Sequence, residues 1–143
     1  METNSQIGPL RIGTLGASRI APAALIEPAR KNDDVVVAAV AARDRQRAEK
    51  YAQKHGIPQV YDTYEALLAD PTLDAIYNPL PNNLHAEWTI RALRAGKHVL
   101  CEKPLACHAG EAREMASRAK ATGLLLMEAF MYRFHPRSRH IKR

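Results

Sequence analysis

The sequence has few of the residues that cross-link or break a fold, and it has no long apolar run. Its two cysteines, Cys101 and Cys107, match neither zinc nor thioredoxin spacing and indicate a reducing compartment. Seven glycines and a hydrophobic fraction of 46% exclude collagen-like and disordered chains. No run approaches the roughly 18 apolar residues of a membrane helix, and residues 1–6 lack the features of a signal peptide. We expect a cytoplasmic protein without a membrane span or a metal site.

The net charge of +6 is concentrated at one end of the chain. Residues 133–143 hold five Lys or Arg and no acid, so residues 1–132 carry a net charge of only +1. No aromatic or base-reading pattern accompanies the basic end. We therefore do not expect nucleic acid as a partner.

Strand-like and helix-like patterns alternate along the whole chain. Short apolar runs predict strands at 11–15, 35–41, 75–77, 98–101 and 124–127. Helical spacing predicts helices that close at Gly56, Gly96 and Gly123, and residues 62–65 form a capping box that is predicted to open a short helix through Leu68. Continuous apolar strands joined by helices are typical of a parallel sheet covered on both faces. We predict a doubly wound α/β fold, in which ligands bind beyond the carboxyl ends of the strands.

A glycine-containing turn follows the first predicted strand. Residues 16–21, Gly-Ala-Ser-Arg-Ile-Ala, match the dinucleotide pattern G-x-G-x-x-G/A with serine in place of the second glycine. Gly16 would permit the tight turn, Ala21 would allow close helix packing, and the helix N-terminus would face a pyrophosphate. Ser18 also suits a helix N-cap. The segment predicts dinucleotide binding, with an ordinary strand-to-helix turn as the alternative.

The end of the run 35–41 predicts the choice of cofactor. NAD enzymes usually place an acid here to hold the ribose hydroxyls, whereas this chain has Ala42 followed by Arg43. A guanidinium can hold a 2′-phosphate with two donors and can stack on adenine. We predict that NADP is preferred to NAD. The alternative is a solvated Arg43 that pairs with Asp44 or Glu49.

Polar residues also follow the runs 75–77 and 98–101. The first is followed by Asn78-Pro79-Leu80-Pro81-Asn82, in which two prolines keep the backbone extended. An Asn or a His, such as His85, at the start of the next helix is expected to face the ligand cleft. The second run is followed by Glu102-Lys103-Pro104. The position at a strand's carboxyl edge favours a site over a solvated ion pair, which is the alternative.

Together these segments resemble the N-terminal half of the glucose–fructose oxidoreductase / inositol dehydrogenase (Gfo/Idh/MocA) family. The resemblance lies in residues 16–21, 42–44, 78–85 and 96–105, and the run G-K-H-V-L-C-E-K-P is its most specific part. Residues 128–136, with Ala42-Arg43 and N-P-L-P-N, are most similar to the NADP-dependent D-xylose and trans-dihydrodiol dehydrogenases. The resemblance implies a Rossmann-type nucleotide domain over residues 1–128. It also implies hydride transfer between a sugar or diol hydroxyl and nicotinamide.

The resemblance implies that Lys103 is the catalytic group. A lysine buried beside a cationic nicotinamide would have its ammonium form disfavoured, and it could accept or relay the proton of the substrate hydroxyl. Glu102 would orient Lys103. The residues that would lie along the nicotinamide ribose are Asn78, Leu80, Asn82 and His85. His85 could instead be a satisfied histidine at the start of a helix. The expected nucleotide-binding residues are Gly16, Ala17, Ser18, Arg19, Ile20, Ala42, Arg43, Asn78, Leu80, Asn82, His85, Glu102 and Lys103.

Members of this family are more than twice as long, and a second α/β domain supplies their substrate pocket and dimerising sheet. We therefore expect residues 129–143 to be a truncated lead-in to a missing C-terminal domain, and most of the oligomerisation surface to be missing with it. A sugar or diol would bind only with that domain. The chain would bind nicotinamide nucleotide without appreciable turnover. The alternatives are a stand-alone nucleotide-binding module and an inert truncated remnant.

Overall fold

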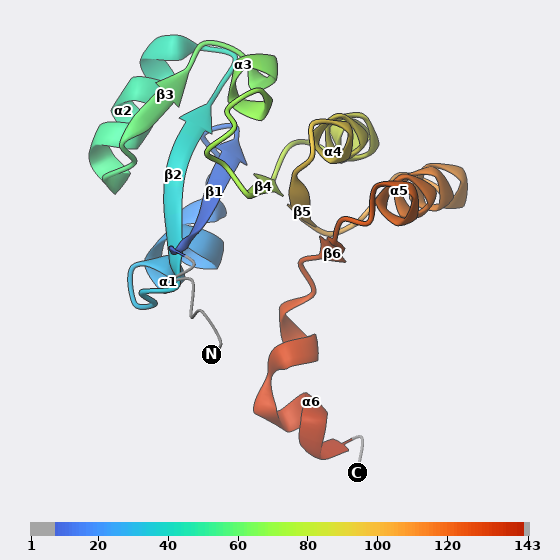
Figure 1. Cartoon of the computed structure of the whole chain (residues 1–143). Helices are drawn as coiled ribbons and strands as arrows, with labels where there is room; N and C mark the ends of the chain where they lie inside the picture. The colour runs from blue at the N-terminus through green and yellow to red at the C-terminus, as the bar shows by residue number, and fades with distance from the viewer. Residues whose placement is uncertain (1–7, 142–143) are drawn as a thin grey trace, which may run out of the picture.

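The computed structural model describes residues 8–141 as a six-stranded parallel sheet with helices on both faces (Figure 1). Its strands are β1 (Leu10–Leu15), β2 (Val35–Ala41), β3 (Gln59–Tyr61), β4 (Ala75–Asn78), β5 (His98–Cys101) and β6 (Leu126–Glu128). Its helices are η1 (Pro22–Ile26), α1 (Glu27–Ala29), α2 (Arg45–His55), α3 (Tyr64–Leu68), η2 (Asn82–Leu84), α4 (His85–Arg94), α5 (Ala109–Thr122), η3 (Met131–Phe134) and α6 (Pro136–Ile141). The signal-peptide prediction concerns residues 1–6, which lie outside this range. Within the range, no helix is both long and apolar enough to cross a membrane.

The strand order is β3-β2-β1-β4-β5-β6, and every neighbouring pair is parallel. The chain builds outward from β1 to β3, crosses back, and then builds outward in the other direction from β4 to β6. Because crossovers are right-handed, α1 and α2 cover one face while α3, α4 and α5 cover the other (Figure 1). The predicted doubly wound α/β fold is confirmed. The reversal between β1 and β4 is where such sheets bind ligands.

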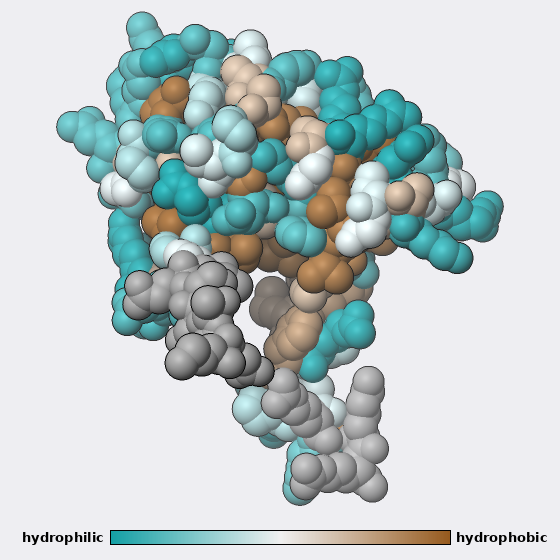
Figure 2. Space-filling model, viewed as in Figure 1, coloured by the Kyte–Doolittle hydropathy of each residue, from teal (hydrophilic) through white to brown (hydrophobic). Residues whose placement is uncertain are grey.

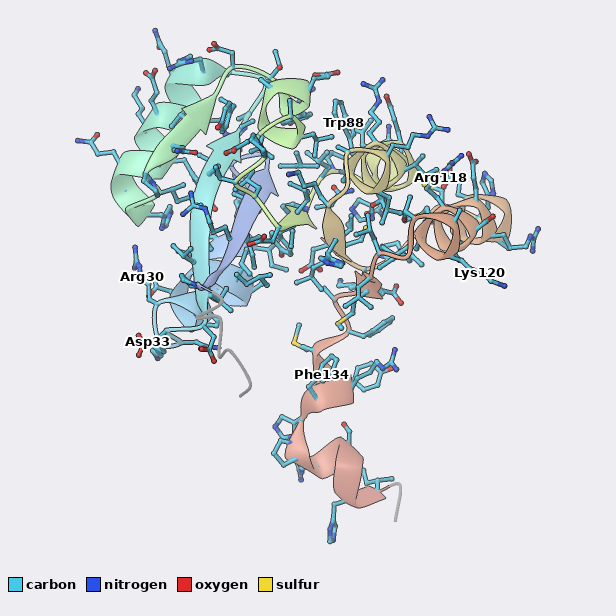
Figure 3. The ribbon with its side chains drawn as sticks, in the orientation of Figure 1. Arg30, Asp33, Trp88, Arg118, Lys120 and Phe134 are labelled. Atoms are coloured by element: carbon cyan, nitrogen blue, oxygen red, sulfur yellow. The ribbon has the colours of Figure 1, made fainter. Side chains whose placement is uncertain are left out.

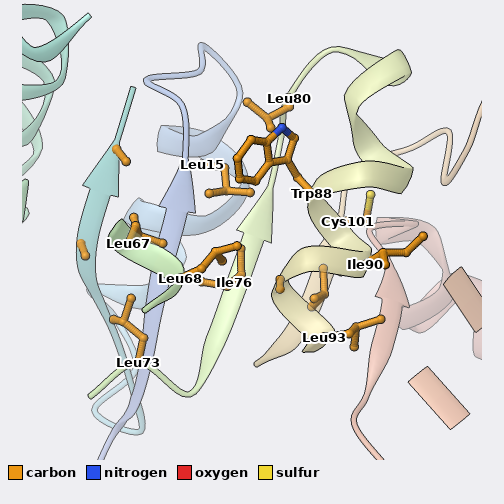
Figure 4. Close-up of a cluster of buried hydrophobic side chains, with 14 of the residues drawn as sticks. Leu15, Leu67, Leu68, Leu73, Ile76, Leu80, Trp88, Ile90, Leu93 and Cys101 are labelled. Carbon is orange, nitrogen blue, oxygen red and sulfur yellow. The ribbon is translucent and has the colours of Figure 1, made fainter. Parts of the chain in front are cut away.

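Each face of the sheet has its own apolar core. The core under α3, α4 and α5 contains Trp88, which lies near Leu15 and Leu80 (Figure 4). Tyr64 packs its ring edge-to-face against Trp88, with the centroids 4.9 Å apart. The core under α1 and α2 includes Tyr77, which is buried. The loops at the carboxyl edge therefore rest on fully packed side chains.

The helix ends largely follow the predicted signals. α2 and α5 end at Gly56 and Gly123, which adopt φ values of +61° and +68° that favour glycine. The predicted capping box is wrong by one residue. The N-cap of α3 is Thr63, whose hydroxyl accepts a hydrogen bond from the Ala66 N–H at 3.0 Å, whereas Asp62 pairs with Arg45.

Two edge strands and the first helix differ from the sequence prediction. The predicted apolar runs did not include β3, because this strand has only three residues and one of them is exposed. β6 begins two residues later than predicted because its pairing with β5 starts at Leu126. The first helix opens with the π-helical turn η1 and continues as α1. Pro28 has no N–H to give to an α-helical bond, which accounts for the irregularity.

The chain leaves the sheet after β6 and extends as η3 and α6 away from the body (Figure 1). We call residues 129–141 the C-terminal arm. Phe134 projects from this arm (Figure 3). Its exposed large apolar side chains are Met131, Tyr132, Phe134 and Ile141. β6 ends at Glu128, where sequence analysis put the end of the nucleotide domain, and the onward role of the arm remains a prediction.

Candidate functional site

Gly16 curves the loop between β1 and η1. It has a φ of +82°, and its N–H donates to the Ala41 carbonyl at 2.6 Å. A Cβ at this position would lie 3.2 Å from a methyl group of Leu80, so a side chain would crowd the loop after β4. The Ser18 hydroxyl accepts a hydrogen bond from the Ala21 N–H at 3.2 Å. The hydroxyl thus bonds a backbone N–H as predicted, but the N-cap of η1 is Ala21 and not Ser18.

A cavity of about 590 Å³ opens at the carboxyl ends of β1, β2 and β4, and we call it the nucleotide cavity. It brings together three segments that sequence analysis treated separately. Its volume lies in the range of small-molecule sites. Its lining residues are Gly16, Ala17, Ser18, Ala42, Arg43, Asp44, Arg47, Tyr64, Pro79, Leu80, Pro81 and Leu84.

Two arginines, Arg43 and Arg47, bring positive charge to the nucleotide cavity. Arg47 Nη2 donates to the Ala17 carbonyl at 2.9 Å. Burial raises the pKa of the Tyr64 phenol in the same wall, and the charges of Arg43 and Arg47 act in the opposite direction. Within residues 8–141, neither arginine forms an ion pair. Both cations therefore remain free to bind an anion.

The proposed alternative for Arg43 finds no support in these contacts. Asp44 caps α2 by accepting from the Arg47 N–H at 3.1 Å, and Glu49 pairs with Arg45. Sequence analysis missed Arg47. The signal that could have found it is the N-cap Asp44, which puts Arg47 in the first turn of α2, beside the carboxyl end of β1.

A second cavity, of about 490 Å³, lies on the other side of the β1 loop, and we call it the apolar cavity. Ile20 of that loop and Tyr77 and Leu100 of the sheet form its wall, and the C-terminal arm contributes Phe130 and Phe134. Hydrophobic side chains gather where the arm leaves the body (Figure 2). Among its described lining residues, the charged one is Glu102.

Glu102 is buried and binds two donors. Tyr77 Oη donates to its Oε1 at 2.7 Å, and the backbone N–H of Lys103 donates to its Oε2 at 3.2 Å. Burial and the bond to Glu102 raise the pKa of Tyr77 well above its ordinary value. Tyr77 therefore stays a donor at neutral pH. Glu102 orients the backbone of Lys103, and no bond to the Lys103 ammonium is formed among the described residues.

Three side chains hold the backbone of residues 103–105. Glu102 accepts a hydrogen bond from the Lys103 N–H, and Glu128 accepts one from the Leu105 N–H at 2.9 Å. His85 Nδ1 lies 2.8 Å from the Pro104 carbonyl. The Lys103–Pro104 peptide bond is cis. The side chain of Lys103 itself is exposed. The described residues therefore do not supply the burial that we expected for this lysine.

Asn78 and His85 are buried under the loop that follows β4. Asn78 Nδ2 donates to the His85 carbonyl at 3.2 Å and to Thr89 Oγ1 at 3.1 Å, while its Oδ1 accepts from the Leu80 N–H at 3.3 Å. Both side chains are thus directed into the protein. They fix the loop that carries Leu80 into the nucleotide cavity.

The predicted site residues therefore fall into four groups. Gly16, Ala17, Ser18, Ala42, Arg43 and Leu80 line the nucleotide cavity, and Ile20 and Glu102 line the apolar cavity. Asn78 and His85 support the loop from beneath. Arg19, Asn82 and Lys103 are exposed and line neither of these two cavities. The individual roles of these residues remain predictions.

Comparison with known proteins agrees with this geometry. A family model described as "Oxidoreductase family, NAD-binding Rossmann fold" (GFO_IDH_MocA) matches residues 10–130. D-xylose 1-dehydrogenase (NADP(+)) 2 of Haloferax volcanii is 49% identical over 127 residues, which are 89% of this chain and 39% of the relative. Trans-1,2-dihydrobenzene-1,2-diol dehydrogenase of Sus scrofa is 47% identical over 100 residues, which are 70% of this chain and 30% of the relative.

A solved structure shares the fold over most of the chain. It is KijD10, a 3-ketoreductase from Actinomadura kijaniata, in complex with NADP. The TM-score is 0.87 at 42% identity, and the match covers 93% of this chain and 42% of that one. The matches thus cover between 30% and 42% of the length of these relatives.

Proposed function

The chain belongs to the Gfo/Idh/MocA oxidoreductases, a family with an NAD-binding Rossmann fold, and from this premise we propose that it binds NADP in preference to NAD. We further propose that it forms the nucleotide-binding part of an enzyme that moves hydride between nicotinamide and a sugar or diol hydroxyl. The observation that carries the proposal is the presence of Arg43 and Arg47 in one cavity with the Gly16 loop.

The residues present fit the adenosine end of such a nucleotide. Gly16 allows the backbone of the loop to approach a pyrophosphate, which a side chain would obstruct. Ala42 leaves room beside β2 where a carboxylate would repel a 2′-phosphate. The guanidinium groups of Arg43 and Arg47, which form no ion pair among the described residues, would supply donors in the fork geometry that a phosphate accepts.

The apolar cavity fits the nicotinamide end of the same nucleotide. Ile20 belongs to the loop that separates the two cavities, so a dinucleotide that crosses the loop reaches both. The nicotinamide, when bound, supplies the hydride acceptor or donor. Lys103 lies next to Glu102 of this cavity, and its ammonium is our candidate to hold or move the proton of the substrate hydroxyl. Tyr77 and Glu102 would fix the backbone from which Lys103 extends.

The substrate class rests on the relatives. D-xylose and dihydrodiol dehydrogenases are among the proteins that this chain matches. We propose that a sugar or diol binds when a C-terminal domain completes the site, and that the apolar surface of the arm is covered in that protein. The 143-residue chain itself is expected to bind nucleotide without turning over D-xylose or a diol.

Calorimetric titration of NADP and NAD into the chain and into Arg43→Ala tests this function. A charge-assisted hydrogen bond is worth about 1.5–3 kcal/mol, so NADP should bind roughly ten- to a hundredfold more tightly than NAD. Arg43→Ala should remove most of that preference. Arg45→Ala is the matched control, because Arg45 is occupied by Glu49 and Asp62 outside the cavity. Equal affinities in the unmodified chain would contradict the proposed preference.

A further inference from the structure

The carboxylate of Glu102 in the apolar cavity has no balancing cation within the part of the chain that the structure describes. The residue is 8% exposed, and among residues 8–141 it forms no ion pair. Its two hydrogen-bond donors, the Tyr77 hydroxyl and the Lys103 N–H, are neutral groups. A buried charge is normally paired, because burial removes the water that would otherwise solvate it. This carboxylate therefore favours a cationic ligand.

The surroundings of the carboxylate keep its field strong. Ile20, Leu100 and Phe130 of the cavity lining have no polar side-chain atoms. Arg19 and Lys103, which adjoin lining residues in the sequence, are exposed, so water and salt screen their charges. Opposite charges attract each other more strongly in such a setting than in water. The apolar cavity should therefore bind a cationic group more tightly than a neutral group of the same shape.

We propose that Glu102 makes the apolar cavity select the oxidised form of the nicotinamide nucleotide. The inference rests on the proposed function, in which the nicotinamide end of the nucleotide enters this cavity. An oxidised nicotinamide ring carries a positive charge, whereas the reduced ring, which has received hydride, is neutral. The adenosine and phosphate groups of the two forms are identical. Glu102 is thus a specificity-determining residue for the oxidation state of the nucleotide.

The two cavities then make separate choices about one ligand. Arg43 and Arg47 line the nucleotide cavity, and the 2′-phosphate that they would hold is present in both oxidation states of NADP. Glu102 lines the apolar cavity and responds to the charge on the nicotinamide ring alone. In an equal mixture of oxidised NADP and NADPH, the chain would therefore carry mostly the oxidised form.

Calorimetric titration of oxidised NADP and of NADPH at neutral pH tests the inference. The measured quantity is the Kd of NADPH divided by the Kd of oxidised NADP, because the contribution of the adenosine end cancels in this ratio. We expect a ratio of at least about ten in the unmodified chain. Glu102→Gln removes the charge with little change in side-chain size, and it should lower the ratio roughly tenfold, mainly by weakening oxidised NADP.

Glu128→Gln is the matched control. Glu128 also accepts a hydrogen bond from the loop after β5, from the Leu105 N–H at 2.9 Å, but it does not line the apolar cavity. Its removal should change the ratio by less than about threefold. Adenosine 2′,5′-bisphosphate, which has no nicotinamide, is the second control probe. Its affinity should be the same in the unmodified chain and in both variants, which would show that the fold and the nucleotide cavity are intact.

The outcomes separate this inference from the proposed function. A ratio near one in the unmodified chain would overturn the inference without any variant. A ratio that stays the same in Glu102→Gln would also overturn it, because the preference would not come from this carboxylate. In both cases the binding of NADP leaves the proposed function standing. If neither form of NADP nor adenosine 2′,5′-bisphosphate binds, the proposed function fails and the inference fails with it.

Discussion

Arg47 Nη2 donates a hydrogen bond of 2.9 Å to the carbonyl oxygen of Ala17, and so joins the first turn of α2 to the loop after β1. The contact holds a cation at the wall of the nucleotide cavity. Because Asp44 caps the same helix through the Arg47 N–H, the position of this arginine is fixed at both its backbone and its side chain.

We predict that Arg47→Leu weakens the binding of NADP about tenfold and that of NAD much less. On the proposed function, Arg47 would give the 2′-phosphate a charged donor, and a tenfold loss corresponds to about 1.4 kcal/mol. Calorimetric titration of both nucleotides measures it. Arg45→Leu is the control, since that neighbouring arginine pairs with Glu49 and Asp62. An equal loss for both nucleotides would mean that Arg47 acts only through the shape of the loop.

Gly16→Ala should weaken the binding of both NADP and NAD by at least tenfold. Its φ of +82° would cost an alanine about 1–2 kcal/mol, and the new Cβ would press on Leu80 at 3.2 Å. Gly123→Ala is a matched control, because Gly123 also has a positive φ of +68° but nothing within 4 Å and lies at the end of α5.

Thermal unfolding and nucleotide titration of these two glycine variants separate strain from site damage. Both variants should lose comparable stability, and only Gly16→Ala should lose affinity. A loss of affinity in Gly123→Ala as well would show that general destabilisation weakens binding.

The sequence predicts the architecture and the residues of the nucleotide cavity well, but it predicts the surroundings of Asn78 and His85 poorly. Residues 16–18, 42 and 43 sit on loops set by a glycine, a cap and a strand end, so local patterns place them in one cavity. Asn78 and His85 instead depend on contacts between loops. Their bonding partners, such as Pro104 and Thr89, lie far enough along the chain that only the folded sheet brings them together.

The same reasoning explains the remaining differences. The N-cap at Thr63 rather than Asp62 reflects a competing partner, because Arg45 of α2 holds Asp62. Lys103 was expected to be buried beside a nicotinamide, but among the described residues its side chain is exposed and only its backbone N–H bonds to Glu102. The first of these differences comes from a contact between separate elements, which the local pattern left open.

The stability of the chain should fall in alkaline solution. Burial raises the pKa of Cys101 from 9.0 to about 12 and raises that of Tyr77 above its ordinary value. Each group is protonated in the fold and ionises more readily when unfolded. Its contribution is therefore complete below the unfolded value and is lost as the pH rises, by at most about 1.4 kcal/mol per pH unit for each group.

Cys101→Ala and Cys107→Ala test this origin, because Cys101 is buried and Cys107 is exposed. Denaturant unfolding between about pH 8 and about pH 10.5 should give a shallower decline for Cys101→Ala than for the unmodified chain. Cys107→Ala should follow the unmodified chain. A parallel decline in all three proteins would show that Cys101 contributes nothing to the pH dependence.

Lys103→Met should leave the fold and nucleotide affinity almost intact while abolishing most turnover in a complete enzyme. Its side chain is exposed, and the backbone contacts of residues 103–105 do not involve the ammonium.

Turnover is measured after joining the chain to the C-terminal part of the Haloferax volcanii relative, to which it is 49% identical. Removing a proton-transfer group costs roughly a factor of 10²–10⁴, so kcat should fall by that much while nucleotide Kd changes less than about threefold. Lys120→Met, an exposed lysine in the last turn of α5, should change neither quantity. Similar losses in kcat and in nucleotide affinity for Lys103→Met would instead identify a structural lysine.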